Sequence, residues 1–199
     1  MRSKLNNLLQ LLSSTDELAM EDAWDALFML VIKGFFGQED AKSVLALLSN
    51  PDETVRFQAW SFLPTLIDQK LVSPEEVKGY LPFLLQLLSN PNPWVRWKAW
   101  KFLSGTIEYL ISAGFLSLED ARPIFQFLLS PIESLRSQAW DRLCRLFRNP
   151  DEVRDYLPSY FQLLSSPEEY IRRDASPLLS VLAERGLLTR EDVGLIFGF

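Results

Sequence analysis

The residues best suited to bind a ligand are two tryptophans and two lysines near the middle of the sequence. They are Trp94, Trp97, Lys98 and Lys101. On a helix, where successive residues are turned by about 100°, all four would share one arc. Two exposed indoles are unfavourable unless a partner covers them, and ammonium groups beside them attract negative charge. The pattern predicts a surface that binds an acidic segment of a protein or peptide.

The residue types that carry out most enzyme chemistry are missing. The sequence contains no histidine, so it lacks the commonest general base, the commonest metal ligand and every nucleophile–histidine pair. It also has no Cys-x-x-Cys pair, no phosphate-cradling glycine loop and no dinucleotide fingerprint. We therefore expect a protein that is not an enzyme and that needs no metal and no cofactor.

The tryptophans and lysines belong to a segment, residues 87–110, whose skeleton recurs along the chain. Each copy has a Leu-Leu step, a small polar turn and a later alanine, which is followed by tryptophan in all copies but the last. The alanines are spaced 36 or 40 residues apart, a period typical of stacked helix pairs. They are Ala23, Ala59, Ala99, Ala139 and Ala175.

The repeat runs nearly from end to end, which favours a single all-α domain over residues 1–199. Hydrophobic residues make up 48% of the chain and charged residues 23%, so a packed core is expected. The predicted organisation is five helix pairs at 3–36, 37–72, 73–116, 117–148 and 149–188, with a partial helix at 189–199.

Local signals mark the ends of the helices. Caps such as Ser73 with Glu76 should begin the first helix of each pair. Gly34, Gly114 and Gly186 follow second helices, where a left-handed cap favours glycine. Lys70 takes that place in the second pair, so we expect a different helix ending there.

Two further features concern the helices themselves. Pro82, Pro123 and Pro158 occupy equivalent places in three first helices and predict a kink in each. The spacing from the repeated tryptophan to the next acidic cap is four residues longer after Trp100 and four shorter after Trp140. The third second helix should therefore gain about one turn, and the fourth should lose about one.

The repeats resemble HEAT repeats, the antiparallel helix pairs of the armadillo-type α-solenoids. The likeness rests on the leucine run, the turn proline and patterns such as Val55, Arg56 and Ala59. It implies a right-handed α-α superhelix, in which the second helices line a concave interaction surface.

In that family an acidic turn residue usually pairs with an arginine six positions later, which builds a ladder between repeats. The turn residues here are neutral, so they can accept a hydrogen bond but supply no countercharge. The resemblance implies a weaker polar ladder in which Arg56, Arg96, Arg136 and Arg172 face Asn50, Asn90, Ser130 and Ser166.

Helical geometry separates two classes of tryptophan. The repeated ones, Trp24, Trp60, Trp100 and Trp140, are expected to pack against the adjacent repeat. On the third second helix we expect the buried face to be centred on Val95, Ala99, Phe102 and Thr106, flanked by Arg96, Trp100, Leu103 and Ile107. Trp94, Trp97, Lys98 and Lys101 then lie opposite the core.

The equivalent arc changes character from one second helix to the next. It is acidic in the first repeat, where it holds Glu21, Asp22 and Asp25, and mixed polar in the last. Such a surface suits an amphipathic helix or an extended peptide with its own charge pattern. The predicted partner-binding set is Trp94, Trp97, Lys98, Lys101, Phe57, Tyr170 and Arg173.

Binding of nucleic acid is the alternative function. Some HEAT-like proteins are DNA glycosylases, and the resemblance would give Trp94, Trp97, Lys98, Lys101 and Asp141 the corresponding groove. The net charge of -6 argues against a chain that coats phosphates. Other HEAT-like proteins, the deoxyhypusine hydroxylases, hold iron through His-Glu pairs, which a chain without histidine cannot form.

The remaining expectations concern location and assembly. One cysteine, Cys144, among leucines and phenylalanine favours a small buried side chain in a reducing compartment. No apolar run reaches the roughly 20 residues of a membrane span, and the amino terminus lacks a continuous signal core, so a cytoplasmic protein is expected. Dimerisation through the C-terminal end would cover Leu195, Ile196, Phe197 and Phe199.

Overall fold

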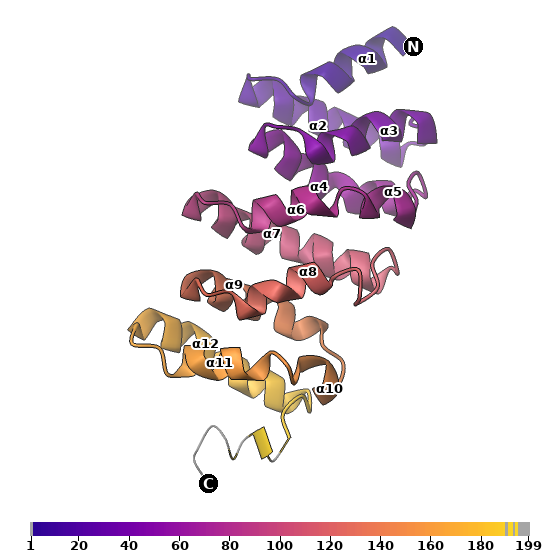
Figure 1. Ribbon diagram of the computed structural model, residues 1–199. Coiled ribbons are helices and arrows are strands. Elements are labelled where there is room, and N and C mark those ends of the chain that lie inside the picture. Colours follow the sequence, from indigo (N-terminus) through magenta and orange to yellow (C-terminus); the bar gives the residue numbers. More distant parts are fainter. Residues whose placement is uncertain (1, 190, 193, 195–199) are drawn as a thin grey trace. The chain divides into compact units, whose positions relative to one another are not determined.

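The protein is built from helices. The computed structural model describes residues 2–189, 191–192 and 194, and within them the chain forms twelve α-helices and three short 3-10 helices, with no strand (Figure 1). This confirms the all-α prediction. In the same residues no helix is both long enough and apolar enough to cross a membrane.

The chain divides into two compact units, Met1–Asp120 (unit 1) and Ala121–Phe199 (unit 2). The single repeat domain over 1–199 therefore stays a prediction. Unit 1 contains α1 (Arg2–Leu11), α2 (Glu17–Ile32), α3 (Gln38–Ala46), η1 (Leu47–Ser49), α4 (Glu53–Asp68), α5 (Pro74–Lys78), α6 (Leu81–Leu88) and α7 (Pro93–Ser112). Unit 2 contains α8 (Arg122–Phe125), η2 (Gln126–Leu129), α9 (Glu133–Leu143), η3 (Cys144–Leu146), α10 (Pro150–Val153), α11 (Leu157–Leu164) and α12 (Glu169–Glu184).

The helix starts form where the sequence places their caps. Ser73 accepts a hydrogen bond from the backbone N–H of Glu76, whose carboxylate accepts one from the backbone N–H of Ser73. Thr189 and Asp192 make the same reciprocal contacts. Most of the partial helix predicted at 189–199 lies outside the described residues.

The three inner prolines interrupt their helices more strongly than a kink would. Pro82 and Pro158 each stand in the first turn of a new helix, α6 or α11, after a break from α5 or α10. Pro123 likewise stands in the first turn of α8. A proline ring fits this position because the backbone there needs no N–H donor. The first helices of these repeats are thus two short helices or a helix preceded by turns.

One expected exception at the helix ends does not occur. Gly34, Gly114 and Gly186 adopt positive φ as predicted, and Lys70 does so too, with φ of 57°. The prediction of a different ending after α4 is wrong. Backbone hydrogen bonds from Lys70 and Leu71 to the end of α4 hold the lysine in the left-handed conformation.

The predicted length changes are confirmed. The second helix α4 has 16 residues and α7 has 20, which is one additional turn. The α-helix α9 has only 11 residues and ends in the 3-10 segment η3.

The four repeated tryptophans are buried, as predicted. In unit 1 the indole N–H of Trp60 donates to the carbonyl of Leu48, and that of Trp100 donates to the carbonyl of Leu88. Both carbonyls belong to the preceding first helix, so each indole fastens the two helices of its pair. In unit 2 the indole of Trp140 donates to the hydroxyl of Ser159 instead.

The buried face of α7 is turned relative to the prediction. Phe102, expected at the centre of that face, is 52% exposed, whereas Trp100, Leu103 and Ile107 are fully buried. Because the large indole of Trp100 occupies the core, the buried arc centres near Leu103, about 100° from Phe102. Phe102 lies at the border of the exposed arc.

The turn arginines also differ from the expected ladder. Arg56, Arg96, Arg136 and Arg172 donate to the backbone carbonyls of Asn50, Asn90, Ser130 and Ser166, within their own turns. The Asn and Ser side chains are already engaged, since each accepts from the backbone N–H two residues later. A link between neighbouring repeats in unit 1 is made by Asn90 itself, whose side-chain amide donates to the carboxylate of Glu53 at 2.5 Å.

Candidate functional site

The candidate site lies on unit 1, where α4 and α7 run side by side. The phenol of Tyr109 donates to the carboxylate of Asp68, 41 residues earlier, near the ends of both helices. The ammonium of Lys98 lies over the ring of Phe57, which is also 41 residues earlier, near their beginnings. Two contacts with the same separation show that α4 and α7 are parallel and in register.

Four aromatic rings form one continuous cluster on these helices. Trp94 and Trp97 are stacked, with ring centroids 4.8 Å apart and planes inclined by 21°. Trp97 meets Phe102 edge to face, and Phe102 meets Phe57 in the same way. The exposed fractions are 66% for Trp94 and 36% for Trp97, so the prediction that both lie on the water-facing arc is confirmed.

The two lysines are held against these rings. The ammonium of Lys101 lies 4.6 Å from the centroid of Trp97 and 5.1 Å from that of Phe102. That of Lys98 lies 4.7 Å from the centroid of Phe57. Such contacts are worth about 0.5–1 kcal/mol each at an exposed site. Among the described residues neither ammonium forms a salt bridge, so both charges are available to a ligand.

A small pocket opens between α4 and α7. Its volume is about 160 Å³, and it is lined by the apolar side chains of Phe57, Leu87, Trp94 and Val95 and by the polar side chains of Glu53, Thr54 and Lys98. The pocket is suited to one apolar side chain. We call the surface formed by Trp94, Trp97, Lys98, Lys101, Phe102 and Phe57, together with this pocket, the Trp–Lys surface.

Sequence reasoning placed five of these six side chains in the site and missed Phe102. The missed signal is its spacing of five residues from Trp97, which on a helix turns it by about 140° and brings it to the far side of Lys101. The two remaining residues of the predicted set, Tyr170 and Arg173, are exposed on α12 in unit 2. Arg173 forms a salt bridge with Asp174.

Two other predicted sites involve residues that do not belong to unit 1. Asp141, the aspartate of the alternative function, belongs to α9 in unit 2 and forms a salt bridge with Arg142. The C-terminal residues Leu195, Ile196, Phe197 and Phe199, proposed for dimerisation, lie outside the described residues.

The cysteine and the metal-ligand residue types are further candidates for a site. Burial raises the pKa of the Cys144 thiol to about 11, so the thiol stays protonated near neutral pH. Its buried place in η3 confirms the prediction of a small apolar side chain. In the part of the chain that the structure describes, no three His, Cys, Asp or Glu side chains are grouped to hold a metal ion.

Comparison with known proteins gives little further guidance. No protein-family model matches the chain, and no curated protein does. A crystal structure of an engineered protein from a structural genomics consortium is similar, with a TM-score of 0.47 and 18% identity over 94% of this chain and 83% of the other. A second engineered protein from the same consortium has a TM-score of 0.40 and 17% identity, over 98% of this chain and 61% of the other. Neither likeness is strong enough to assign a fold or a function.

Proposed function

We propose that this chain is a HEAT-like α-solenoid that binds a segment of a protein or peptide on the Trp–Lys surface and catalyses no reaction. In this proposal the helix pairs stack into a right-handed superhelix, and the second helices line its concave side. The repeat spacing and the parallel, in-register packing of α4 and α7 support that arrangement. The single buried cysteine is consistent with a cytoplasmic location.

The observation that carries the binding function is the exposed pair of stacked indoles beside the ammonium groups of Lys98 and Lys101, which form no salt bridge within the described part of the chain. Tryptophan is over-represented among the residues that dominate binding energy at interfaces. The ring stack fixes both indoles before a ligand arrives, so little conformational entropy is lost on binding. The lysines add a preference for a ligand segment that carries carboxylates.

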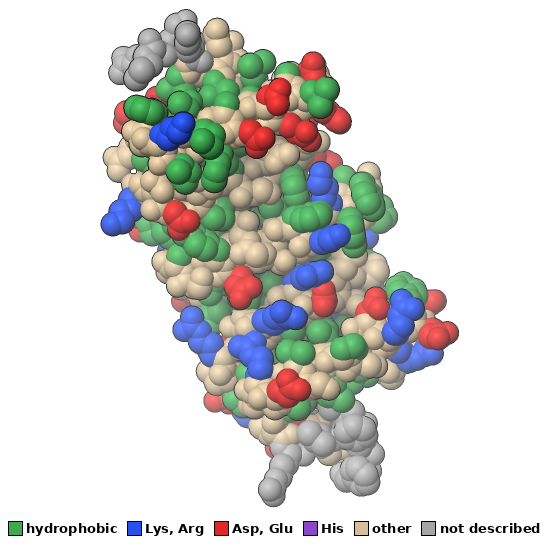
Figure 2. Space-filling view, turned by 180° about the vertical axis from the view of Figure 1, so that it is seen from behind, with side chains coloured by type: hydrophobic (Ala, Val, Ile, Leu, Met, Phe, Trp, Pro, Cys, Tyr) green, Lys and Arg blue, Asp and Glu red, His purple; other side chains and the backbone are tan. Residues whose placement is uncertain are grey.

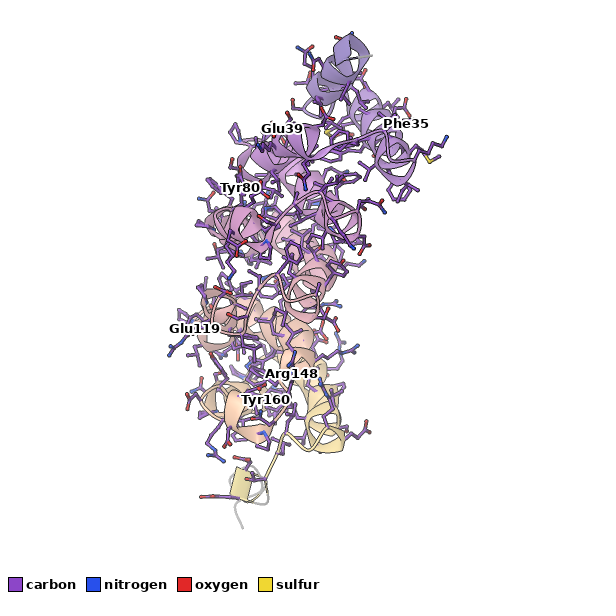
Figure 3. All side chains as sticks on the ribbon, turned by 90° about the vertical axis from the view of Figure 1, so that its right-hand side faces the viewer. Phe35, Glu39, Tyr80, Glu119, Arg148 and Tyr160 are labelled. Atoms are coloured by element: carbon purple, nitrogen blue, oxygen red, sulfur yellow. The ribbon has the colours of Figure 1, made fainter. Side chains whose placement is uncertain are left out.

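The test is affinity selection on the immobilised chain from a displayed library of random peptides about twelve residues long, followed by measurement of Kd for the enriched peptides. The double variant Trp94→Ala, Trp97→Ala should weaken their binding at least about 30-fold, because a dominant contact is worth about 2 kcal/mol or more. The control is Phe35→Ala, an exposed aromatic that follows α2 (Figure 3) and is about as exposed as Trp94, and it should leave Kd unchanged. Equal losses in both variants, or no enriched peptide, would refute the proposal.

Binding of single-stranded nucleic acid is the second candidate, because stacked aromatic rings with adjacent lysines are also what unpaired bases bind. The net charge of -6 weighs against it. A labelled single-stranded oligonucleotide should show no binding at low salt. Binding that is lost in Lys98→Glu, Lys101→Glu would establish this function in place of the first.

A further inference from the structure

The helix on the other side of α4 carries carboxylates at the repeat positions where α7 carries its tryptophan and lysines. Glu21, Asp22 and Asp25 of α2 are separated from the repeated Trp24 by the same steps as Trp97, Lys98 and Lys101 are from Trp100. All three carboxylates are exposed. Within the described residues none of them takes part in a salt bridge or in a side-chain hydrogen bond.

We call Glu21, Asp22 and Asp25 the acidic strip, and Lys98 and Lys101 the basic strip. The two strips lie on the same side of unit 1. Helix α4 packs against α2 and against α7, and the ring of Phe62 on α4 meets that of Trp24 on α2, with centroids 5.4 Å apart. Equivalent positions of the three helices therefore follow one another across a single surface. Figure 2 shows a group of acidic side chains toward the amino-terminal end of the chain.

Between the strips the equivalent α4 positions are uncharged, although the carboxylate of Glu53, one turn before Phe57, also lines the pocket. The α4 positions equivalent to the three carboxylates are Phe57, Gln58 and Ser61. Packed helices are about 8–10 Å apart, so the strips are separated by roughly 16–20 Å. This exceeds the Debye length of about 8 Å at physiological ionic strength, so each strip attracts charge without being cancelled by the other.

We propose that unit 1 binds a peptide ligand in one orientation, which is set by the order of the charges along the peptide. The ligand is a segment with carboxylates at one end, which lie on Lys98 and Lys101, and with lysine or arginine at the other end, which lie on Glu21, Asp22 and Asp25. An apolar side chain between them enters the pocket beside Phe57 and Trp94. About six residues of extended chain span the distance. The inference rests on the proposed peptide-binding function and adds the orientation of the bound segment.

The test compares reversals of the two strips, using a peptide selected on the wild-type chain and its counterpart with every acidic and basic residue exchanged. The acidic-strip variant is Glu21→Lys, Asp22→Lys, Asp25→Lys, and the basic-strip variant is Lys98→Glu, Lys101→Glu. Each should weaken binding of the selected peptide at least about tenfold, since like charges then face each other. The chain with both reversals should bind the exchanged peptide as tightly as the wild type binds the original.

Two results would overturn the inference while leaving the proposed function standing. One is a selected peptide whose affinity falls with Trp94→Ala, Trp97→Ala and changes less than about twofold with the acidic-strip variant. The other is a wild-type chain that dimerises in sedimentation and becomes monomeric with either reversal, because the two strips then bind a second copy. Circular dichroism of every variant, matched to wild type, excludes misfolding as the cause of a loss. A library that yields no peptide would remove the function and the inference together.

Discussion

Replacing Ser159 with alanine tests how much its buried hydrogen bonds stabilise unit 2. The hydroxyl of Ser159 accepts from the indole of Trp140 at 3.2 Å, and its one proton is shared between the carbonyl oxygens of Leu128, at 2.5 Å, and Tyr156, at 2.7 Å. At the equivalent place in unit 1 the indole of Trp100 reaches the carbonyl of Leu88 directly. The hydroxyl of Ser159, on α11, thus bridges α9 and η2 through hydrogen bonds.

The expected cost follows from the two polar groups that lose their partner. Ser159→Ala leaves the N–H of Trp140 and the carbonyl of Leu128 without the hydroxyl, in a place where the serine is only 8% exposed. An unsatisfied buried donor or acceptor costs about 1–3 kcal/mol. We therefore expect the free energy of unfolding to fall by about 1–3 kcal/mol for the Trp140 donor, and by a further amount for Leu128, which loses a hydrogen bond shared with Tyr156.

The assay is urea unfolding followed by far-ultraviolet circular dichroism and tryptophan fluorescence. The matched control is Ser165→Ala, because Ser165 is on the same segment and its hydroxyl also donates to a backbone carbonyl, but it is exposed. The control should change stability by less than about 0.5 kcal/mol. If Ser159→Ala were as mild, the indole of Trp140 would have moved to bind Leu128 directly, and the reasoning would be refuted.

Three further predictions concern stability. Trp100→Ala should cost about 3–5 kcal/mol, because the indole is 1% exposed, whereas Trp94→Ala should cost less than about 1 kcal/mol in the same thermal unfolding assay, and the opposite order would contradict the two classes of tryptophan. Lys70→Gly should raise the urea midpoint and stabilise the fold by about 0.5–1 kcal/mol, because φ of 57° is strained for a residue with a side chain. A lowered midpoint would show that contacts of the lysine side chain stabilise the fold by more than the backbone strain destabilises it. Hydrogen bonds, the largest from Lys78, lower the pKa of Asp120 from 3.8 to about 2, so its contribution to stability is present above the unfolded pKa and is lost as the pH falls from about 4 to 2. Lys78→Met should return the pKa measured by nuclear magnetic resonance toward 3.8, and an unchanged pKa would contradict this cause.

The features that the sequence predicts well are determined by neighbouring residues. Helix caps such as Ser73 with Glu76 depend on three or four consecutive positions, and both partners are visible in the sequence. The extra turn of α7 follows from counting residues between two fixed signals. The exposure of Trp94 and Trp97 also follows, because on a helix they are turned by about 180° and 120° from Leu103, near which the buried arc is centred.

The features that the sequence does not predict depend on packing across helices. The exposure of Phe102 is an example, because its repeat equivalent Phe62 is buried under Trp24. The choice of acceptor by Arg96 is another. Its guanidinium reaches the backbone carbonyl of Asn90, since the side-chain oxygen of that asparagine already accepts from a backbone N–H. Periodicity cannot distinguish two acceptors on one residue.

Contacts within the Trp–Lys surface explain how it can remain exposed. Trp94 lies in the first turn of α7, where its backbone N–H donates to the cap residue Asn92, and its ring rests on Trp97 one turn later. The stack removes part of each indole from water, and Lys101 covers another part of Trp97. A bound carboxylate would draw the ammonium off the ring while the stack stays in place. Binding would therefore exchange a contact worth about 0.5–1 kcal/mol for a charge-assisted hydrogen bond, with the indoles already ordered.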